Sequence, residues 1–184
     1  MKKINPLIFF YSLCFLFLFS CSEPQDFNQA KDLEVIPDVS GSIVYVETTE
    51  AIINSTSPGT ITQNINFDAF TSSIFSDKVI SGSVKFQLEN TTSKNMQVQI
   101  DFLDASGVPL DSFQVTALAA PPETTSELEV AYGPPSGRNI AIIRNTSSIQ
   151  LTYVNASDNT SVSSLSNPKL IFKSSASFKL RLVE

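Results

Sequence analysis

The sequence predicts an all-β protein, with one antiparallel β-sandwich domain over residues 39–184. Apolar and polar residues alternate with a period of two along many short segments, as expected of strands with one face in the core and one in water. Clusters of Gly, Pro, Asn, Asp and Ser separate these segments. Sustained helical periodicity is missing, which argues against an α/β fold.

An export signal is predicted for residues 1–20. Lys2 and Lys3 precede an apolar run, Leu7 to Phe19. The positive residues would stay at the cytoplasmic face, while the apolar run is shorter than the ~20 residues that span a bilayer stably. No basic cluster follows Ser20, which argues against an uncleaved membrane anchor.

The end of this signal, Leu18-Phe19-Ser20-Cys21, resembles the lipobox of bacterial lipoproteins, and its Phe-rich core resembles the signals of Bacteroidetes. The resemblance implies that Cys21 becomes the first mature residue and carries the lipid anchor, palmitate included. Ser22 after the cysteine, in place of Asp, resembles lipoproteins sent to the outer membrane. The alternative is an ordinary secretory signal that ends near a chance cysteine.

Residues 21–38 are predicted to be the lipidated cysteine and a flexible tether. The stretch is rich in polar and charged residues and contains few apolar ones. Alternatively, Phe27, Ala30, Leu33 and Val35 would form a short helical turn that docks on the domain.

Two strands have the clearest alternation. Ile80, Val84, Phe86 and Leu88 define one apolar face, and Met96, Val98, Ile100 and Phe102 define the other. Further strands are predicted at Ser42–Glu47, Ile61–Phe67, Ser112–Ala117, Leu128–Tyr132, Ile149–Val154, Lys169–Lys173 and Ser177–Val183. One short helix containing Ile140 and Ile143 is expected after Pro134-Pro135-Ser136-Gly137.

One stretch carries a resemblance. Gly82-Ser83-Val84, Asn90-Thr91-Thr92 and the run from Ile100 to Leu110 resemble the FxLyD-type immunoglobulin-like domain of bacterial surface proteins. The resemblance implies an immunoglobulin-like sandwich in an extracytoplasmic setting and no particular activity. Within the predicted hairpin, Asp104 can accept backbone N–H bonds, Gly107 can adopt positive φ, and Leu110 restarts the core face.

Composition excludes several functions. Loss of Lys2 and Lys3 with the signal takes the formal net charge from −6 to −8, which disfavours nucleic-acid binding. The sequence has no His, and its cysteines are only Cys14 in the signal and Cys21. A Ser-His-Asp triad, a Cys nucleophile and a Cys-bearing zinc site are therefore absent, and no cofactor is expected. A Ser-Lys dyad or a carboxylate pair remains open.

Carboxylates raise the question of calcium. Asp101, Asp104 and Asp111 flank one predicted hairpin, and Asp158 with Asn159 marks another loop. No EF-hand spacing is present. We expect no metal site, with Asp104 and Asp158 in turns and Asp101 and Asp111 on the solvent face.

These observations predict a lipid-anchored binding or structural accessory protein of the cell envelope, without catalytic residues, that contacts the membrane through its lipid and an envelope protein or glycan as partner. The alternative is a glycan-binding or adhesion module of an outer-membrane capture system. Against it stands the absence of Trp, and most Phe, Tyr132 and Tyr153 are expected in the core, while Tyr45 is uncertain. Asn-x-Ser/Thr triplets are interpreted as polar turns; they begin at Asn54, Asn90, Asn145, Asn155 and Asn159.

Overall fold

The computed structural model describes residues 34–56 and 60–182. The predicted signal, Cys21 and the tether up to residue 33 lie outside the described residues. The chain from Val35 onward forms one compact unit. Its first residues run beside the end of the last strand, because the Val35 and Pro37 carbonyls accept backbone hydrogen bonds from Leu182 and Leu180. Val35 is therefore part of an extended segment.

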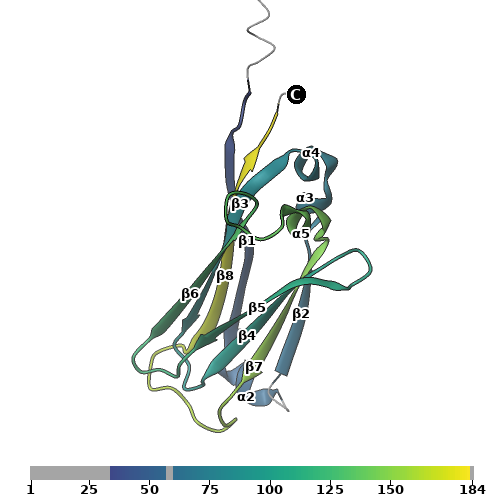
Figure 1. The fold of residues 1–184 in the computed structure, drawn as a ribbon. Coiled ribbons are helices and arrows are strands. Elements are labelled where there is room, and N and C mark those ends of the chain that lie inside the picture. Colours follow the sequence, from purple (N-terminus) through teal and green to yellow (C-terminus); the bar gives the residue numbers. More distant parts are fainter. Residues whose placement is uncertain (1–33, 57–59, 183–184) are drawn as a thin grey trace, which may run out of the picture. The chain divides into compact units, whose positions relative to one another are not determined.

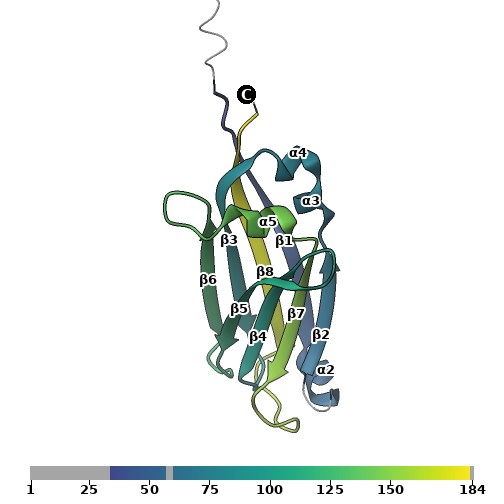
Figure 2. The same cartoon turned by 45° about the vertical axis from the view of Figure 1, so that its right-hand side comes forward.

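Within the described ranges, eight strands form two four-stranded antiparallel sheets packed face to face (Figures 1 and 2), which confirms the predicted all-β antiparallel sandwich. The first sheet has the order β1-β8-β3-β6, and the second has the order β2-β7-β4-β5. The strands of the first sheet are β1 (Asp38–Thr49), β8 (Lys169–Leu180), β3 (Val79–Asn90) and β6 (Thr124–Tyr132). Those of the second are β2 (Thr60–Asn66), β7 (Ser148–Asn155), β4 (Met96–Leu103) and β5 (Pro109–Ala117).

The strands pair in a nested order. β1 pairs with β8, β2 with β7, β3 with β6, and β4 with β5, so the chain resembles one long hairpin rolled into two layers. This is the arrangement of an eight-stranded jelly roll. An immunoglobulin sandwich instead divides seven strands into groups of four and three with a different connectivity. The all-β fold class was predictable from the alternation of apolar and polar residues. The order in which the strands connect was not, because it depends on which strands pair across the whole chain.

The core lies between the sheets, where the two clearest predicted strands meet as β3 and β4. Val84, Phe86 and Leu88 of β3 are buried, and so are the alternating apolar residues of β4. Ile80 is only half-buried, because a register shift between Val79 and Ser81 places Val79 in the core instead. The two strands predicted at 169–173 and 177–183 are one continuous strand, β8.

Helices are short and lie at the two ends of the sandwich (Figure 1). They are α2 (Glu50–Ser55), α3 (Asp68–Thr71), α4 (Ser73–Ser76) and α5 (Ile140–Asn145). The predicted helix with Ile140 and Ile143 is confirmed as α5, which buries Ile143. Within the described ranges, none of the helices is long and apolar enough to cross a bilayer. The end that carries α2 is called the α2 end below.

Candidate functional site

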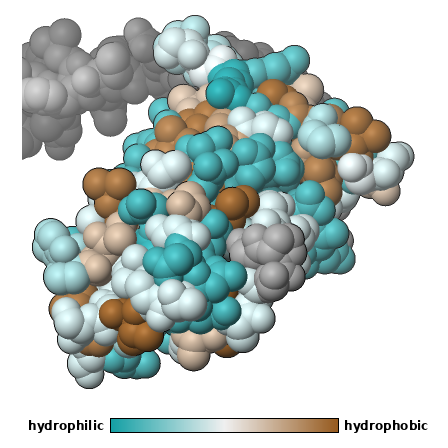
Figure 3. All heavy atoms as spheres, turned by 90° about the horizontal axis from the view of Figure 1, so that it is seen from below, coloured by the Kyte–Doolittle hydropathy of each residue, from teal (hydrophilic) through white to brown (hydrophobic). Residues whose placement is uncertain are grey.

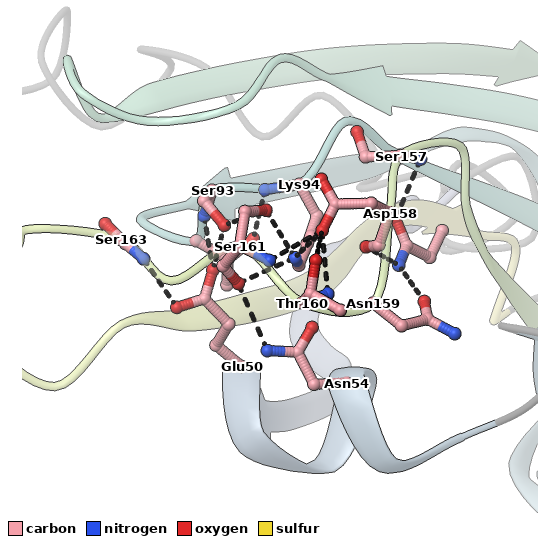
Figure 4. Close-up of polar contacts among 12 residues, drawn as sticks. Glu50, Asn54, Ser93, Lys94, Ser157, Asp158, Asn159, Thr160, Ser161 and Ser163 are labelled. Carbon is pink, nitrogen blue, oxygen red and sulfur yellow. Dashed lines mark hydrogen bonds and ion pairs between the residues drawn. The ribbon is translucent and has the colours of Figure 1, made fainter.

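Charged and hydroxyl side chains converge at the α2 end, in the group drawn in Figure 4. Glu50 begins α2, Lys94 lies in the β3–β4 loop, and Asp158 lies in the long β7–β8 loop. Glu50 is 2 % exposed and Lys94 is fully buried. Three serines link these charges, and the group is called the Glu50–Lys94 cluster; its serines are Ser93, Ser161 and Ser163.

The buried ammonium group of Lys94 is fully engaged. Its Nζ donates to the Oγ of Ser161 at 2.6 Å and to the Ser161 carbonyl at 2.8 Å. An ion pair with Asp158 Oδ1 at 3.3 Å completes its environment. A buried charge is tolerated only when it is paired and hydrogen-bonded, and Lys94 meets both conditions.

Glu50 is held in the same way from the opposite side. Its Oε1 accepts hydrogen bonds from the Ser93 backbone N at 2.5 Å and the Ser93 Oγ at 2.6 Å, and its Oε2 accepts from the Ser163 N at 2.9 Å. Burial pushes the pKa of Glu50 upward. The hydrogen bonds from Ser93 and Ser163, with the positive charge of Lys94, outweigh burial and hold the pKa below its ordinary value of 4.5.

The hydroxyl protons of the cluster have a defined order. Ser93 donates its hydroxyl proton to Glu50, so in the 3.0 Å contact between the two serine hydroxyls the donor is Ser161. Ser161 in turn accepts from Lys94. A catalytic Ser-Lys dyad needs a neutral amine that takes the serine proton. Here the ammonium donates to the serine and is paired with a carboxylate, so the geometry favours a structural role.

Asp158 folds the β7–β8 loop. Its Oδ1 accepts hydrogen bonds from the backbone N of Ser161 at 2.6 Å and of Thr160 at 2.7 Å. These backbone bonds, together with the ammonium of Lys94, hold the pKa of Asp158 well below its usual range. The predicted turn role of Asp158 is confirmed, and the loop carries Ser161 and Ser163 into the cluster.

The other three acidic residues considered for calcium, Asp101, Asp104 and Asp111, make their hydrogen bonds outside the Glu50–Lys94 cluster. Asp104 Oδ1 accepts from the backbone N of Ser106 and Val108, and Gly107 has φ 78°, as predicted for the hairpin turn. Asp101 lies on the outer face of its sheet and accepts from Ser112. The described residues contain no group of three His, Cys, Asp or Glu side chains that could hold a metal ion.

The prediction that Asp111 lies on the solvent face is wrong. Its side chain is only 10 % exposed, pairs with Arg138 and accepts a hydrogen bond from the Tyr132 hydroxyl at 3.2 Å. The regular register of β4 and β5 pairs Asp111 with the inward-facing Phe102, and the register shifts only beyond this pair. Directly opposite residues share a face, so Asp111 turns inward.

The Asn-x-Ser/Thr triplets interpreted as polar turns begin within or at the ends of regular elements. Asn90 and Asn155 end β3 and β7, Asn145 ends α5, and Asn54 lies in α2. Asn90 is fully buried at the end of β3, where its amide donates to the carbonyls of Lys94 and Leu118. Tyr132 and Tyr153 are buried in the core, while Tyr45 is 61 % exposed. In the described part of the chain, Tyr45 is the one aromatic among the exposed large apolar side chains.

The surface of the α2 end offers no continuous apolar patch in the view from below. Figure 3 shows a mainly hydrophilic face with separate apolar residues. Ile52 of α2, Val162 of the β7–β8 loop and Leu118 after β5 are exposed. The buried cluster therefore lies beneath a surface of mixed polarity.

Sequence reasoning missed Glu50, Ser93 and Lys94. Each lies in a short polar stretch that is typical of solvent-exposed loops, and no local pattern marks them as buried. The one local signal is Thr49, whose side chain accepts a hydrogen bond from the Ile52 N and caps α2, so that Glu50 stands in the first helical turn. That signal predicts a helix start, and burial follows only from the two loops that cover it.

Acid should weaken the fold through Glu50. Its pKa is lowered in the folded state, so its contribution to stability is present above the unfolded value of 4.5 and is lost as pH falls through the folded value. We expect the free energy of unfolding of the Glu50→Gln variant to decrease less than that of the native protein between about pH 5 and pH 3. Urea titrations at each pH measure this, with the exposed Glu123→Gln as a control. Equal acid sensitivity of Glu50→Gln and the native protein would contradict the assignment.

Comparisons with known proteins give fold-level likenesses. The sequence matches no family model and no curated protein. A protein of Parabacteroides distasonis assigned as secreted is similar with a TM-score of 0.41 and 14% identity, over 65% of this chain and 37% of its own. The VP2 subviral particle of infectious bursal disease virus is similar with a TM-score of 0.37 and 15% identity, over 83% of this chain and 33% of its own. A chain of Desmodium yellow mottle tymovirus is similar with a TM-score of 0.38 and 7% identity, over 83% of this chain and 90% of its own.

The chain spans little more than a third of the Parabacteroides protein and a third of the VP2 protein. With TM-scores below 0.5, these likenesses carry no argument about function. A secreted protein of the Bacteroidetes is among the similar structures.

Proposed function

We propose that this protein is a lipid-anchored accessory of the bacterial outer membrane, which presents a rigid β-sandwich for binding and performs no catalysis. The observation that carries the non-catalytic part of the proposal is the direction of the hydrogen bonds in the Glu50–Lys94 cluster. Serine, lysine and carboxylate groups meet there, yet the ammonium donates to Ser161 and the relay ends on the Glu50 carboxylate. These groups are arranged to fasten three segments of chain together.

Anchoring is supported by the sequence. The apolar run closes on Cys21, and a polar stretch separates that cysteine from Val35, where the compact unit begins. An acidic domain is repelled by anionic lipid headgroups, so a covalent lipid would be its means of staying at the membrane.

The Cys21→Ala variant is expected to lose acylation and to leave the membrane fraction, or to accumulate as the uncleaved precursor. Three acyl chains exceed the roughly two lipid anchors that stable membrane binding needs. Their loss should therefore abolish almost all retention of the protein in the membrane fraction. Membrane fractionation and mass spectrometry of the mature N-terminus measure the result. Cys14→Ala, which lies within the predicted signal, is the matched control. Unchanged retention and an unchanged N-terminal mass for Cys21→Ala would refute the anchor.

Glycan binding is a second candidate function. It is favoured by Tyr45, whose exposed ring stands beside a hollow of about 250 Å³ lined by Lys85, Gln87 and Lys173. Exposed aromatic rings next to polar side chains suit sugar rings, which have apolar faces and hydroxyl edges.

A further inference from the structure

Small side chains form rows across the outer face of the first sheet. In one row the registered partners are Ser40, Ser177, Ser83 and Ala131, one from each strand of the sheet. In the next row Ser42 lies opposite Ser175, and Lys85 and Glu129 complete the row on β3 and β6. Directly paired residues share a face, so these serines stand side by side on the outside of the sheet.

Tall side chains border these rows. Tyr45, Lys173, Gln87 and Glu127 form the next row that faces outward. The resulting hollow measures about 430 Å³ over the serines and adjoins the 250 Å³ hollow beside Tyr45, because both share Ser42, Lys85 and Ser175 as lining residues. We call this surface the serine groove.

A bulge in β1 sets the edge of the groove. The register with β8 shifts between Ser42 and Val44, and both Ile43 and Val44 pack against the core. The outward phase therefore resumes at Tyr45, which lies opposite Lys173. The Tyr45 hydroxyl donates a hydrogen bond to Glu47 Oε2 at 3.1 Å.

The groove offers several hydroxyls, and one carboxylate, that of Glu129, also lines it. Ser40 donates to Ser177 at 2.8 Å, whereas the hydroxyls of Ser42, Ser83 and Ser175 make no hydrogen bond to other described residues. The two lysines beside the groove are each paired with a glutamate: Lys85 with Glu127 at 2.7 Å and Lys173 with Glu89 at 2.6 Å. Paired charges in water attract an ionic ligand weakly.

We infer that the serine groove binds a neutral polysaccharide, with Tyr45 stacking on one sugar ring and the serines bonding to sugar hydroxyls. A hydroxyl is both donor and acceptor, so serines match a polyhydroxylated chain without any charge. The row crosses four strands, or ~14 Å, which accommodates a short run of sugar rings. An extended peptide would instead pair with a free sheet edge and need side-chain pockets. This inference rests on the proposed binding function and names its ligand class.

The test is affinity electrophoresis of the full-length protein, purified in detergent, through gels containing xylan, laminarin, dextran or galactomannan. At least one polysaccharide should retard the native protein. Tyr45→Ala removes the ring and Ser175→Gln fills the groove, so each should weaken binding about tenfold or more. Tyr45→Phe keeps the ring and should bind within about twofold of the native protein. Thr116→Gln, on the outer face of the second sheet, is the matched control and should bind normally.

Three results would overturn the inference. These are an absence of retardation by all four polysaccharides, retardation that Tyr45→Ala and Ser175→Gln leave unchanged, and a loss in Tyr45→Phe equal to that in Tyr45→Ala. Circular dichroism of each variant separates lost binding from lost folding. The measurement uses no membrane, so its failure and a failure of lipid anchoring at Cys21 are distinguishable.

Discussion

The Lys94→Met variant is expected to lose about 3–5 kcal/mol of unfolding free energy, the usual result when one partner of a buried charged group is removed. Lys94 is fully buried, and the positive charge of its ammonium stabilises the nearby carboxylate of Glu50. Methionine has most of the volume of the lysine side chain but carries no charge. Glu50 would then remain a buried anion without a neighbouring cation, and the hydroxyl of Ser161 would lose its donor.

Urea unfolding at pH 7 measures this loss, and a double-mutant cycle identifies its source. If Glu50 and Lys94 stabilise each other, the Glu50→Gln and Lys94→Met changes together should cost less than the sum of the two single changes. Lys85→Met is the matched control, because the Lys85 side chain is 45% exposed and its ion pair with Glu127 lies in water. It should be much milder than Lys94→Met. A Lys94→Met variant as stable as the native protein would refute a stabilising role for the Glu50–Lys94 cluster.

The Phe86→Ala variant should cost about 3–5 kcal/mol, through lost burial and a residual cavity. Phe86 of β3 is 1% exposed and lies among rings from both sheets. Its ring centroid is 5.6 Å from that of Phe113 and 6.2 Å from those of Phe102 and Phe172. Removal of this ring opens the centre of the contact between the two layers.

Gln99→Ala is the comparison for Phe86→Ala. Gln99 faces outward from β4 between buried neighbours, so its truncation should change the unfolding free energy by at most about 0.5 kcal/mol. Urea midpoints of the two variants, measured with a common slope, give the difference. Midpoints that shift equally would mean that the inward and outward faces of these strands are wrongly assigned.

The strands and their faces were predictable because period-two alternation is a local property. It located β3 and β4 within two residues, and it failed where a strand lacks large apolar residues. Ser174, Ser175 and Ala176 interrupt the apolar pattern of β8, which made one strand look like two. Ser174 is buried although it is polar, so only its neighbours in the sheet reveal its position.

The Glu50–Lys94 cluster could not be predicted, because its members come from three distant segments. Glu50 Oε2 bonds to Ser163, 113 residues later in the sequence. Alternation says which face of a strand is buried, and it says nothing about loops that cover a charge. The serine groove has the same origin: its serines look like ordinary solvent-facing residues until the sheet register places them side by side.

The nested pairing of strands also determines when the domain can fold. Among these eight strands, only β4 and β5 are both consecutive in sequence and paired in one sheet. β1 pairs with β8 alone, so that Asp38 forms its pair with Lys179 only after both ends of the domain have come together. Contacts this distant carry a high loop-closure entropy and are typical of proteins that fold in milliseconds to seconds. β1 therefore has no strand to pair with until the segment that forms β8 is present. For a chain that crosses a membrane before it folds, as proposed here, that delay keeps the polypeptide in a translocatable state until its C-terminal segment is available.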